Sequence, residues 1–485
     1  MNLAERFSSH PEQNPALVDG TTRMSYGRLE QELARWRGGL AAEGVGVGDR
    51  VALLGSTDLP FVLAYLAIVG VGAVAVPLNP QSPPAALARE LDMVRPAAVV
   101  SAGPTGSPGA DLSTDRPAAT RVIDPGRLSS ADPAPLATVA ASAPAVMLFT
   151  SGTAGRSKPA VLTHGNLDAG TRSLLALPLD LVDAGHVVAA TIPLFHIFGL
   201  NTVLNLGLAA GATIVLHHYR SPRHLAELVE AEQVTVLSGP PTMWRALAYA
   251  EEAGAEQFRS IKLAISGAAK LPPALHGEVV TRLGIELSEG YGLTETSAIV
   301  ATGAGTDAPV GSVGRLLPGV EARLVDADGV DVLVGDPGEI WVRGPMVSPG
   351  YFGPDGTIGG VGNDEGWFQT GDVGVVDDDG NIAIVDRLSD LVIVSGFNVF
   401  PDEVETVLNS HPGVAGAAVT GEPDELTGER LVAHVVVNEG WEFDVDALVA
   451  HCGLALARYK VPKRFEARDH LPTGLGGKLK RRELG

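Results

Sequence analysis

Apolar segments of the chain alternate between the helical and the strand pattern, and this alternation restricts the folds open to it. Residues 26–44, "YGRLEQELARWRGGLAAEG", have helix-like spacing, whereas "DRVALLG" (49–55) has the short apolar run of a buried strand. The strand pattern returns in "ATIVLHHY" (212–219), "VTVLSGPP" (234–241) and "IKLAISGAA" (261–269), each after a helix-like segment. Such alternation predicts parallel β/α layers, so we expect an α/β protein.

Two long uncharged stretches have the alternative interpretation of membrane spans. The first, "LPFVLAYLAIVGVGAVAVPL" (59–78), is long enough to cross a bilayer. Gly70 and Gly72 divide it into a helix-like half and a Val-rich, strand-like half that is closed by Pro77. The second, residues 187–219, is interrupted by proline, histidine and several glycines. We therefore favour buried helix–strand units over membrane spans.

The character of the sequence changes along the chain and predicts two domains. Residues 101–144 are rich in Ala, Pro, Gly and Ser and read as loops around a short strand near 121–124. After residue 311, period-two alternation with Gly/Asp turns predicts an antiparallel sheet or small barrel. "FPDEVETVLNSHPGV" then reads as a capped helix. We expect a large multi-layer α/β N-terminal domain with a small β-barrel-like part (1–386) and a small α+β C-terminal domain (387–485).

Charge and cysteine content argue against several classes of protein. The formal net charge of -22 is unsuited to a general nucleic-acid binder, which needs a basic face. The single cysteine, Cys452, allows neither an intramolecular disulfide nor a Cys-rich metal site, and we expect it to be a small buried side chain. The first residues, "MNLAERFSSHPEQ", lack the apolar core of a secretion signal, so we expect a cytoplasmic protein.

One segment gathers glycines and hydroxylated residues around a single cation. "FTSGTAGRSKPAVLTHGNL" (149–167) lies between an apolar run and a helix start. Backbone N–H groups in such a loop can point at an anion, with Lys158 as a charge on a flexible stem, and proteins hold phosphates in this way. It is not the Walker pattern, because Pro159 follows the lysine. From these residues alone, a solvated surface turn and a phosphate-binding loop are both open.

Further segments follow this loop in a characteristic order. After "FTSGTAGRSKPAVLTH" come "PLFHIFGL", "EGYGLTET", "WFQTGD", "DRLSDLVIVSGFNVFPDEVE" and the terminal "LPTGLGGKLKRREL". Together they resemble the motifs of the adenylate-forming superfamily, which includes acyl-CoA synthetases, luciferase-like enzymes and adenylation domains. The resemblance spans essentially the whole chain and is greatest to bacterial fatty-acyl-CoA synthetases.

The resemblance implies an AMP-forming carboxylate–CoA ligase with two half-reactions. A carboxylate attacks the α-phosphate of ATP to give an acyl-adenylate and pyrophosphate, and the thiol of coenzyme A then attacks the acyl carbon. Attack of an anion on a polyanion depends on positioning and charge neutralisation. The implied cofactors are ATP, Mg²⁺ and coenzyme A, and the implied substrate is a medium- or long-chain fatty acid. The small C-terminal domain is expected to be mobile, since it rotates between the steps, and a homodimer is left open.

The resemblance also assigns roles to residues of the N-terminal domain. It assigns binding of the β- and γ-phosphates to a loop that contains Thr150, Ser151, Gly152, Thr153 and Gly155, with Lys158 as a supporting cation. The nucleotide-facing residues are Gly267 and Ala268 near the adenine and acyl group, Tyr291 and Gly292 at the adenine, Thr294 near the α-phosphate, and Glu295 as a ligand of Mg²⁺. Thr294 and Glu295 have a structural alternative as helix-capping groups. His196 is placed at a gate beside the acyl pocket, where a purely structural role is the alternative.

Departures from the family pattern occur in the phosphate loop and at the hinge. Ala154, Ser157 and Pro159 replace the threonine, proline and glycine that are common there, which puts the mobility of the loop in question. Ser389 stands at the hinge, where the family commonly has Asp or Lys. A hinge needs only to absorb a backbone rotation, so serine is compatible with one.

The remaining roles fall near and within the C-terminal domain. Asp372 resembles the carboxylate that takes both ribose hydroxyls, and Arg387 the arginine that contacts ribose or phosphate. Gly396 is expected to line the pantetheine tunnel. Lys478, in a Gly-Gly-Lys arm, resembles the lysine that bridges the substrate carboxylate and the α-phosphate in the first half-reaction.

Three alternatives stay open at this stage. Malonate or another small carboxylate is one, with Lys270 or Arg245 as the charge for a second carboxylate. Transfer to a carrier-protein thiol is another, although the insertion that fatty-acyl-AMP ligases usually carry between their domains has no room here. A non-catalytic nucleotide-binding relative is the third.

Overall fold

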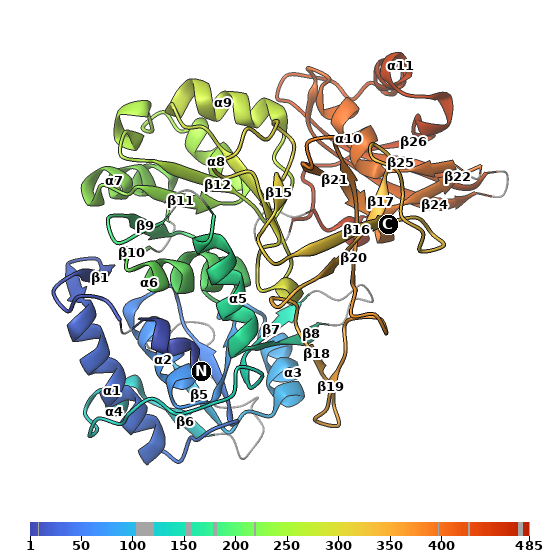
Figure 1. The fold of residues 1–485 in the computed structure, drawn as a ribbon. Helices are drawn as coiled ribbons and strands as arrows, with labels where there is room; N and C mark the ends of the chain where they lie inside the picture. The colour runs from blue at the N-terminus through green and yellow to red at the C-terminus, as the bar shows by residue number, and fades with distance from the viewer. Residues whose placement is uncertain are drawn as a thin grey trace. The chain divides into compact units, whose positions relative to one another are not determined.

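The computed structural model describes residues 1–7, 9–102, 121–150, 157–177, 182–217, 220–395, 397–424, 427–473 and 479–484, with only the main chain of Ser389, Asn398 and Arg482. They form two compact units, labelled by element in Figure 1. Unit 1 comprises Met1–Ala322 and Val342–Gln369, and unit 2 comprises Arg323–Trp341 and Thr370–Gly485. The domain boundary expected after residue 386 lies in β21 (Ile382–Arg387), within unit 2, and stays a prediction.

The first sheet of unit 1 has nine strands in the order β15-β14-β13-β12-β11-β9-β10-β1-β2. From β1 to β13 each neighbouring pair along this order is parallel, and antiparallel pairs occur only towards its two ends. The strands are β1 (Pro15–Asp19), β2 (Thr22–Ser25), β9 (Val187–Ala190), β10 (Thr213–Leu216), β11 (Val236–Gly239), β12 (Leu263–Ser266), β13 (Ser288–Tyr291), β14 (Ala301–Thr302) and β15 (Arg315–Leu316).

The second sheet has eight strands in the order β19-β18-β8-β7-β4-β3-β5-β6. Strands β7 and β8 form an antiparallel hairpin, and β18 pairs antiparallel with β8. The strands are β3 (Arg50–Leu54), β4 (Val74–Leu78), β5 (Ala98–Ser101), β6 (Arg121–Ile123), β7 (Pro144–Thr150), β8 (Lys158–Thr163), β18 (Gly350–Phe352) and β19 (Ile358–Gly359).

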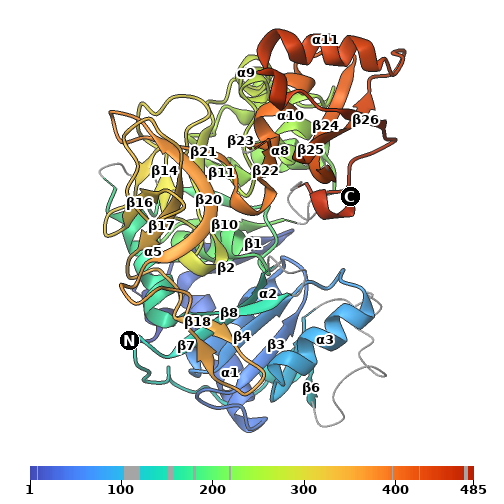
Figure 2. The same cartoon turned by 90° about the vertical axis from the view of Figure 1, so that its right-hand side faces the viewer.

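Helices cover the outer face of each sheet and fill the space between the two sheets. Buried side chains of α7, α8 and α9 pack on β9, β11 and β12, whereas α3 packs on β3 and β4, beside which it runs in Figure 2. Between the sheets lie α1, α2, α5 and a π-helical segment. The helices are α1 (Tyr26–Ala42), α2 (Leu59–Gly70), α3 (Pro84–Val94), α4 (Pro125–Ser129), α5 (His164–Leu175), the π-helix Phe198–Asn205, α6 (Leu206–Ala210), α7 (Pro222–Glu232), α8 (Pro241–Ala248) and α9 (Pro273–Leu283), with 3-10 turns at Leu3–Phe7, Ala255–Phe258 and Thr294–Thr296.

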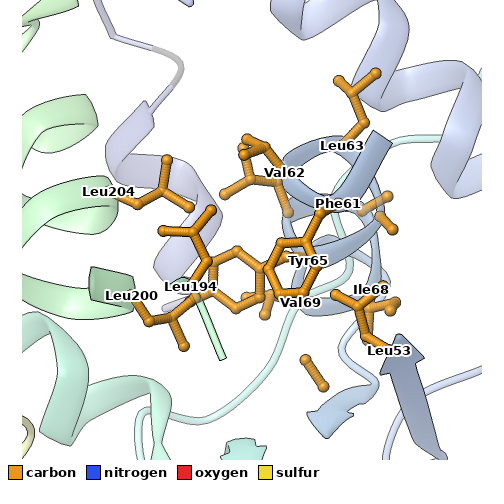
Figure 3. Close-up of a cluster of buried hydrophobic side chains, with 14 of the residues drawn as sticks. Leu53, Phe61, Val62, Leu63, Tyr65, Ile68, Val69, Leu194, Leu200 and Leu204 are labelled. Carbon is orange, nitrogen blue, oxygen red and sulfur yellow. The ribbon is translucent and has the colours of Figure 1, made fainter. Parts of the chain in front are cut away.

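Helix α2 explains the long apolar stretch. Asp58 caps its N-terminus by accepting a hydrogen bond from the N–H of Phe61 at 3.0 Å, and Gly72, with φ of +77°, turns the chain into β4. Its residues from Phe61 to Gly70 are buried on all sides, and Figure 3 shows Tyr65 beside Leu194 and Leu200. A helix that is apolar all round belongs in a core, so the predicted helix–strand unit is confirmed. No helix in the described part of the chain is long and apolar enough to cross a membrane.

Unit 2 contains two further sheets. A four-stranded sheet in the order β16-β17-β20-β21 forms where the sequence predicts an antiparallel sheet or small barrel. A second sheet, in the order β23-β22-β25-β24 with β26 beside β25, packs on α10 and α11. The elements are β16 (Glu321–Val325), β17 (Gly338–Arg343), β20 (Phe368–Val376), β21 (Ile382–Arg387), β22 (Val392–Val394), β23 (Phe397–Val399), α10 (Pro401–Asn409), β24 (Val414–Asp424), β25 (Gly428–Val437), α11 (Val445–Ala455) and β26 (Arg464–Ala467), with 3-10 turns η5 (Leu388–Asp390), η6 (Arg458–Lys460) and η8 (Arg481–Glu483).

Two local expectations need adjustment. The predicted loop region contains the short strand β6, as expected, but also α4, which the Ala/Pro-rich composition conceals. Helix α10 forms as predicted, yet its N-cap residue, Phe400, makes no side-chain capping bond. Instead, Asp386 accepts a hydrogen bond from the N–H of Asp402 at 2.9 Å. Cys452 is buried in the core of unit 2, as expected.

Candidate active site

The predicted phosphate loop connects the paired strands β7 and β8. Thr150 and Lys158 are cross-strand partners at the loop end of this hairpin. Residues Ser151, Gly152, Thr153 and Gly155 lie outside the described residues. The Lys158 Nζ atom lies 5.4 Å from the centroid of the Tyr351 ring, within range of a cation–π interaction. The described ends of the loop therefore place its cation beside an aromatic side chain of β18.

Tyr351 also contacts the predicted magnesium ligand. Its hydroxyl donates a hydrogen bond to Glu295 Oε1 at 2.5 Å. Burial, followed by the charge and the hydrogen bond of Glu295, raises the pKa of Tyr351, so the hydroxyl keeps its proton at neutral pH. Glu295 is itself buried. We call Lys158, Tyr351 and Glu295 the Lys–Tyr–Glu cluster.

The short turn that carries Glu295 is fixed from several directions. Ser348 donates its N–H to the Glu295 carbonyl at 2.7 Å, and Asn201 of the π-helix donates to the Ser297 carbonyl at 2.9 Å. Ser297 and Ala298 both have positive φ, +55° and +95°, which non-glycine residues adopt only at a cost of about 1–3 kcal/mol each. Strained backbone held by tertiary contacts is typical of functional sites. Where the structural alternative placed a helix start, Thr294 and Glu295 lie in a single 3-10 turn.

Close backbone approach explains the glycine at the predicted adenine site. Tyr291 ends β13 and is buried. A Cβ atom on the next residue, Gly292, would lie 2.1 Å from the Ala298 carbonyl oxygen, so no other residue fits without a backbone shift. The strained turn at Ser297 and Ala298 therefore requires a glycine at position 292, because its backbone lies directly against Gly292. The described residues place Tyr291, Gly292, Thr294 and Glu295 in one continuous stretch at the carboxyl end of a parallel strand, where α/β sheets bind ligands.

The predicted acyl side lies at the carboxyl end of the neighbouring strand β12. A Cβ atom on Gly267 would lie 2.8 Å from Cε1 of Phe198, so the ring of the π-helix packs directly on this glycine. Ala268 has φ of +68°, an unusual value for a residue with a Cβ atom. Gly267 and Tyr291 lie at the carboxyl ends of β12 and β13. Because these two strands are paired in parallel, the two residues are close in space although they are distant in the sequence.

His196 precedes the π-helix and is not a core residue. Its side chain reaches solvent, yet the surrounding protein desolvates the ring and lowers its pKa, so it is neutral near pH 7. Its Nδ1 atom accepts a hydrogen bond from the N–H of Phe198 at 3.3 Å. π-helical segments are rare and occur frequently at functional sites. The ring is thus held beside Phe198 at the start of the π-helix, and the role of His196 as a gate stays a prediction.

Unit 2 brings together the two predicted ribose-binding residues. Asp372 in β20 and Arg387 in β21 are cross-strand partners, and Arg387 Nε lies 2.9 Å from Asp372 Oδ1. Asp372 is buried, whereas the Arg387 side chain is 32% exposed. A buried carboxylate oriented by an arginine can accept hydrogen bonds from a diol. Lys478 and Gly396 lie outside the described residues, as does the side chain of Ser389.

Sequence reasoning missed Tyr351 and Arg481. Tyr351 belongs to "GEIWVRGPMVSPGYF", which predicts only a strand, and nothing in its spacing indicates contact with Glu295. Arg481 follows the predicted catalytic lysine closely, but it reads as one of several cations in "KLKRREL". Both gain their significance from partners that are distant in the sequence.

The donor set around Glu295 fits a magnesium ion that is shared with a nucleotide. Mg²⁺ prefers one or two carboxylates together with substrate phosphates rather than an all-protein cage. The described residues contain no group of three or more His, Cys, Asp or Glu side chains placed to hold a metal. The buried Glu295 carboxylate, oriented by Tyr351, would supply the protein ligand.

Family models match nearly the whole chain. A model of the AMP-binding enzyme family matches residues 3–352, and a model of the AMP-binding enzyme C-terminal domain matches residues 403–478. A feruloyl-CoA synthase of an Amycolatopsis species is 36% identical over 482 residues, which is 99% of this chain and 96% of that protein. A long-chain-fatty-acid–CoA ligase of Salmonella typhimurium is 32% identical and covers 100% of this chain, with 93% of its own length matched.

Solved structures agree in fold. ATP-bound MatB from Rhodopseudomonas palustris superposes with a TM-score of 0.90 at 31% identity, over 100% of this chain and 98% of that one. The o-succinylbenzoate CoA synthetase of Bacillus subtilis, in complex with its acyl-adenylate, superposes with a TM-score of 0.86 at 28% identity, over 100% of this chain and 97% of that one.

The fold and the site define a nucleotide-dependent ligase with a large α/β part and a small C-terminal part. The chain belongs to the AMP-binding enzyme family of adenylate-forming proteins. It is an AMP-forming acyl-CoA synthetase, that is, an ATP-dependent acid–thiol ligase.

Proposed function

We propose that this ligase activates monocarboxylic acids with an apolar acyl group, most simply medium- or long-chain fatty acids, in a Mg²⁺-dependent reaction. The observation that carries the proposal is the Lys–Tyr–Glu cluster, where Tyr351 contacts both the carboxylate of Glu295 and the cation of Lys158 beside the predicted phosphate loop. ATP and coenzyme A are the substrates that the enzyme shares with its family. Since both are available in the cytoplasm, we propose that the enzyme acts there; a homodimer stays a prediction.

In the first half-reaction the residues act by position and charge. Lys158 would neutralise the β- and γ-phosphates, together with Thr150 and the residues of the loop. Glu295 would hold Mg²⁺, which when bound neutralises charge on the phosphates, and Thr294 would contact the α-phosphate. Lys478 would bridge the attacking carboxylate and the α-phosphate. No nucleophile on the protein is required.

Further residues would bind the nucleoside and the second substrate. Tyr291 would stack on the adenine, with Gly267, Ala268 and Gly292 allowing close approach, and Asp372 with Arg387 would take the ribose. Gly396 would line the path of the pantetheine thiol. We also propose that the C-terminal domain (387–485) rotates about Ser389 between the half-reactions, relative to the N-terminal domain (1–386).

The apolar character of the acyl side supports the choice of substrate. Phe198 packs against Gly267, and Met243 packs against Gly239, at the carboxyl ends of neighbouring strands. The two cations considered for a second carboxylate, Lys270 and Arg245, both have exposed side chains. A hydrocarbon chain would be favoured in such surroundings by about 0.8 kcal/mol for each buried methylene.

An aromatic acid is the second candidate. The feruloyl-CoA synthase matches this chain at 36% identity over almost its full length, and the fatty-acid ligase at 32%. An aromatic acyl group would find the same small and apolar neighbours. Malonate has the weaker support, because it needs a cation for its second carboxylate.

A screen of acids tests the proposal. Pyrophosphate release is measured with ATP and Mg²⁺ for acids from acetate to palmitate, for malonate, and for benzoates and ferulate, each with and without coenzyme A. We expect release with fatty acids and acyl-CoA only when the thiol is present. Release with ferulate or malonate alone would move the substrate to that class. ATP binding without release for any acid would contradict the proposal and favour the non-catalytic relative.

A further inference from the structure

One guanidinium near the end of the chain is surrounded by three carboxylates. Arg481 Nε and Nη2 donate to the two oxygens of Glu405 at 3.0 and 2.8 Å, which is a bidentate contact. Arg481 Nη1 donates to Asp390 at 2.8 Å and lies 3.9 Å from Asp386. We call these four residues the Arg481 cluster. All four belong to unit 2.

The carboxylates of the cluster are themselves fixed to different elements. Glu405 of α10 also accepts the N–H of Val419 in β24 at 2.7 Å. Asp386 of β21 accepts the N–H of Asp402, at the start of α10, as well as that of Arg387. Asp390 ends η5, the turn that contains the predicted hinge. The cluster thus ties β21, the hinge turn, α10 and the terminal segment into one body.

The cluster lies at the base of the segment that contains Lys478. On the two sides of residues 474–478, Thr473 and Leu479 form an antiparallel bridge. The N–H of Lys480 donates to the Pro472 carbonyl at 2.9 Å. Arg481 follows directly and begins η8, which packs on β24. The described ends of the segment are therefore joined to each other and then to the Arg481 cluster.

We propose that Arg481 is a positioning residue for adenylation. It fixes the base of the Lys478 segment to the hinge turn and α10, so that Lys478 is carried with this body into the first half-reaction. The proposal rests on the proposed function, because it takes Lys478 as the residue that acts on the α-phosphate. Thioester formation from a preformed acyl-adenylate does not need Lys478, so it should not need Arg481.

Arginine is required for a geometric reason. Its planar fork matches both oxygens of Glu405 and still leaves Nη1 for Asp390, whereas a lysine ammonium is a point charge without this fork. Arg481→Lys therefore keeps the positive charge among the three carboxylates but removes the bidentate geometry. Glu405→Gln weakens the same contact from the side of α10. Two independent variants thus address one interaction.

The two half-reactions are measured separately for each variant. With Arg481→Lys we expect carboxylate-dependent ATP–pyrophosphate exchange to fall by about tenfold or more, the loss expected for one charge-assisted bidentate contact. Thioester formation from supplied acyl-adenylate should stay within about twofold of wild type. Glu405→Gln should show the same split. Lys480→Ala is the control, since its side chain pairs with Glu483 at the surface.

Hydrogen exchange supplies a readout that does not depend on activity. In Arg481→Lys and Glu405→Gln, but not in Lys480→Ala, the amides of residues 479–484 should exchange faster than in wild type. Equal loss of both half-reactions, or no loss of either, would overturn the positioning role. No exchange of pyrophosphate by the wild-type enzyme would overturn the proposed function, and the positioning role with it.

Discussion

The Lys–Tyr–Glu cluster of unit 1 and the Arg481 cluster of unit 2 use charge in opposite ways. The buried carboxylate of Glu295 is held by a neutral hydroxyl, that of Tyr351. The guanidinium of Arg481 is met by three carboxylates. The charge of Glu295 is not neutralised by its neutral partner, so it can still bind an ion. The charge of Arg481 is neutralised by its carboxylate partners, so it serves to hold structural elements together. The contrast suggests chemistry for the first cluster and positioning for the second.

The largest expected effect is on the first cluster. Glu295→Gln should lower adenylation by about 100- to 1000-fold, the range seen when a preorganised electrostatic contact is lost from an active site. Unfolding free energy should change by less than about 1 kcal/mol, because the amide oxygen can still accept from Tyr351. ATP–pyrophosphate exchange and thermal unfolding measure the two quantities. Glu278→Gln, an exposed pair partner of Arg282 on α9, is the control.

Substitution in the Arg481 cluster should instead lower the stability of the protein. Arg481→Met leaves three carboxylates without their cation and should destabilise unit 2 by about 3–5 kcal/mol, as expected when one partner of a buried ion pair is removed. Denaturant unfolding of the full chain, followed by hydrogen exchange in unit 2, measures this loss. Unchanged stability would contradict the structural role of the cluster.

The stability of unit 1 should also depend on pH through one buried histidine. His164 is fully buried in unit 1, its Nδ1 atom accepts the N–H of Leu3, and burial lowers its pKa from 6.5 to about 4. The lowered pKa means that the neutral form is favoured on folding. Its contribution is therefore present above pH 6.5 and is lost as the pH falls towards 4. We expect a loss of roughly 3 kcal/mol over this window.

The variant His164→Gln isolates this contribution. A glutamine can accept the same hydrogen bond but does not titrate. The pH dependence of unfolding free energy in unit 1 should therefore be flatter for the variant between pH 6.5 and 4. Parallel pH profiles for the variant and the wild-type protein would show that His164 does not titrate as its burial indicates.

The smallest effect should come from the hydroxyl that orients Glu295. Tyr351→Phe keeps the ring beside Lys158 but removes the hydrogen bond to the carboxylate. We expect adenylation to fall by about tenfold, equivalent to about 1.4 kcal/mol, and half-saturation to require more Mg²⁺. A titration of Mg²⁺ at fixed ATP provides the measurement. An unchanged Mg²⁺ requirement would remove Tyr351 from the ion site.

The sequence predicted those parts of the site that lie along one stretch of chain. Tyr291 ends one strand, with Gly292, Thr294 and Glu295 directly after it, and the order of helices and strands in unit 1 follows from apolar spacing. Patterns of this kind are local, so a sequence can carry them.

Contacts between distant segments could not be predicted in this way. Tyr351 meets Glu295 because β18 pairs with β8 and the turn after β13 packs beside them, and no periodicity encodes that meeting. Asp386 caps α10 from another element, where the sequence suggested a local cap. Arg481 is indistinguishable from its basic neighbours until Glu405 and Asp390 are placed around it.

The transfer of oxygen tests adenylate formation most directly. The preferred acid is supplied with ¹⁸O in its carboxylate, together with ATP, Mg²⁺ and coenzyme A, and the nucleotide product is analysed by mass spectrometry. If the carboxylate attacks the α-phosphate, the AMP that is released with acyl-CoA carries one ¹⁸O atom. Acyl-CoA formed together with unlabelled AMP, or with ADP and labelled phosphate, would contradict this mechanism.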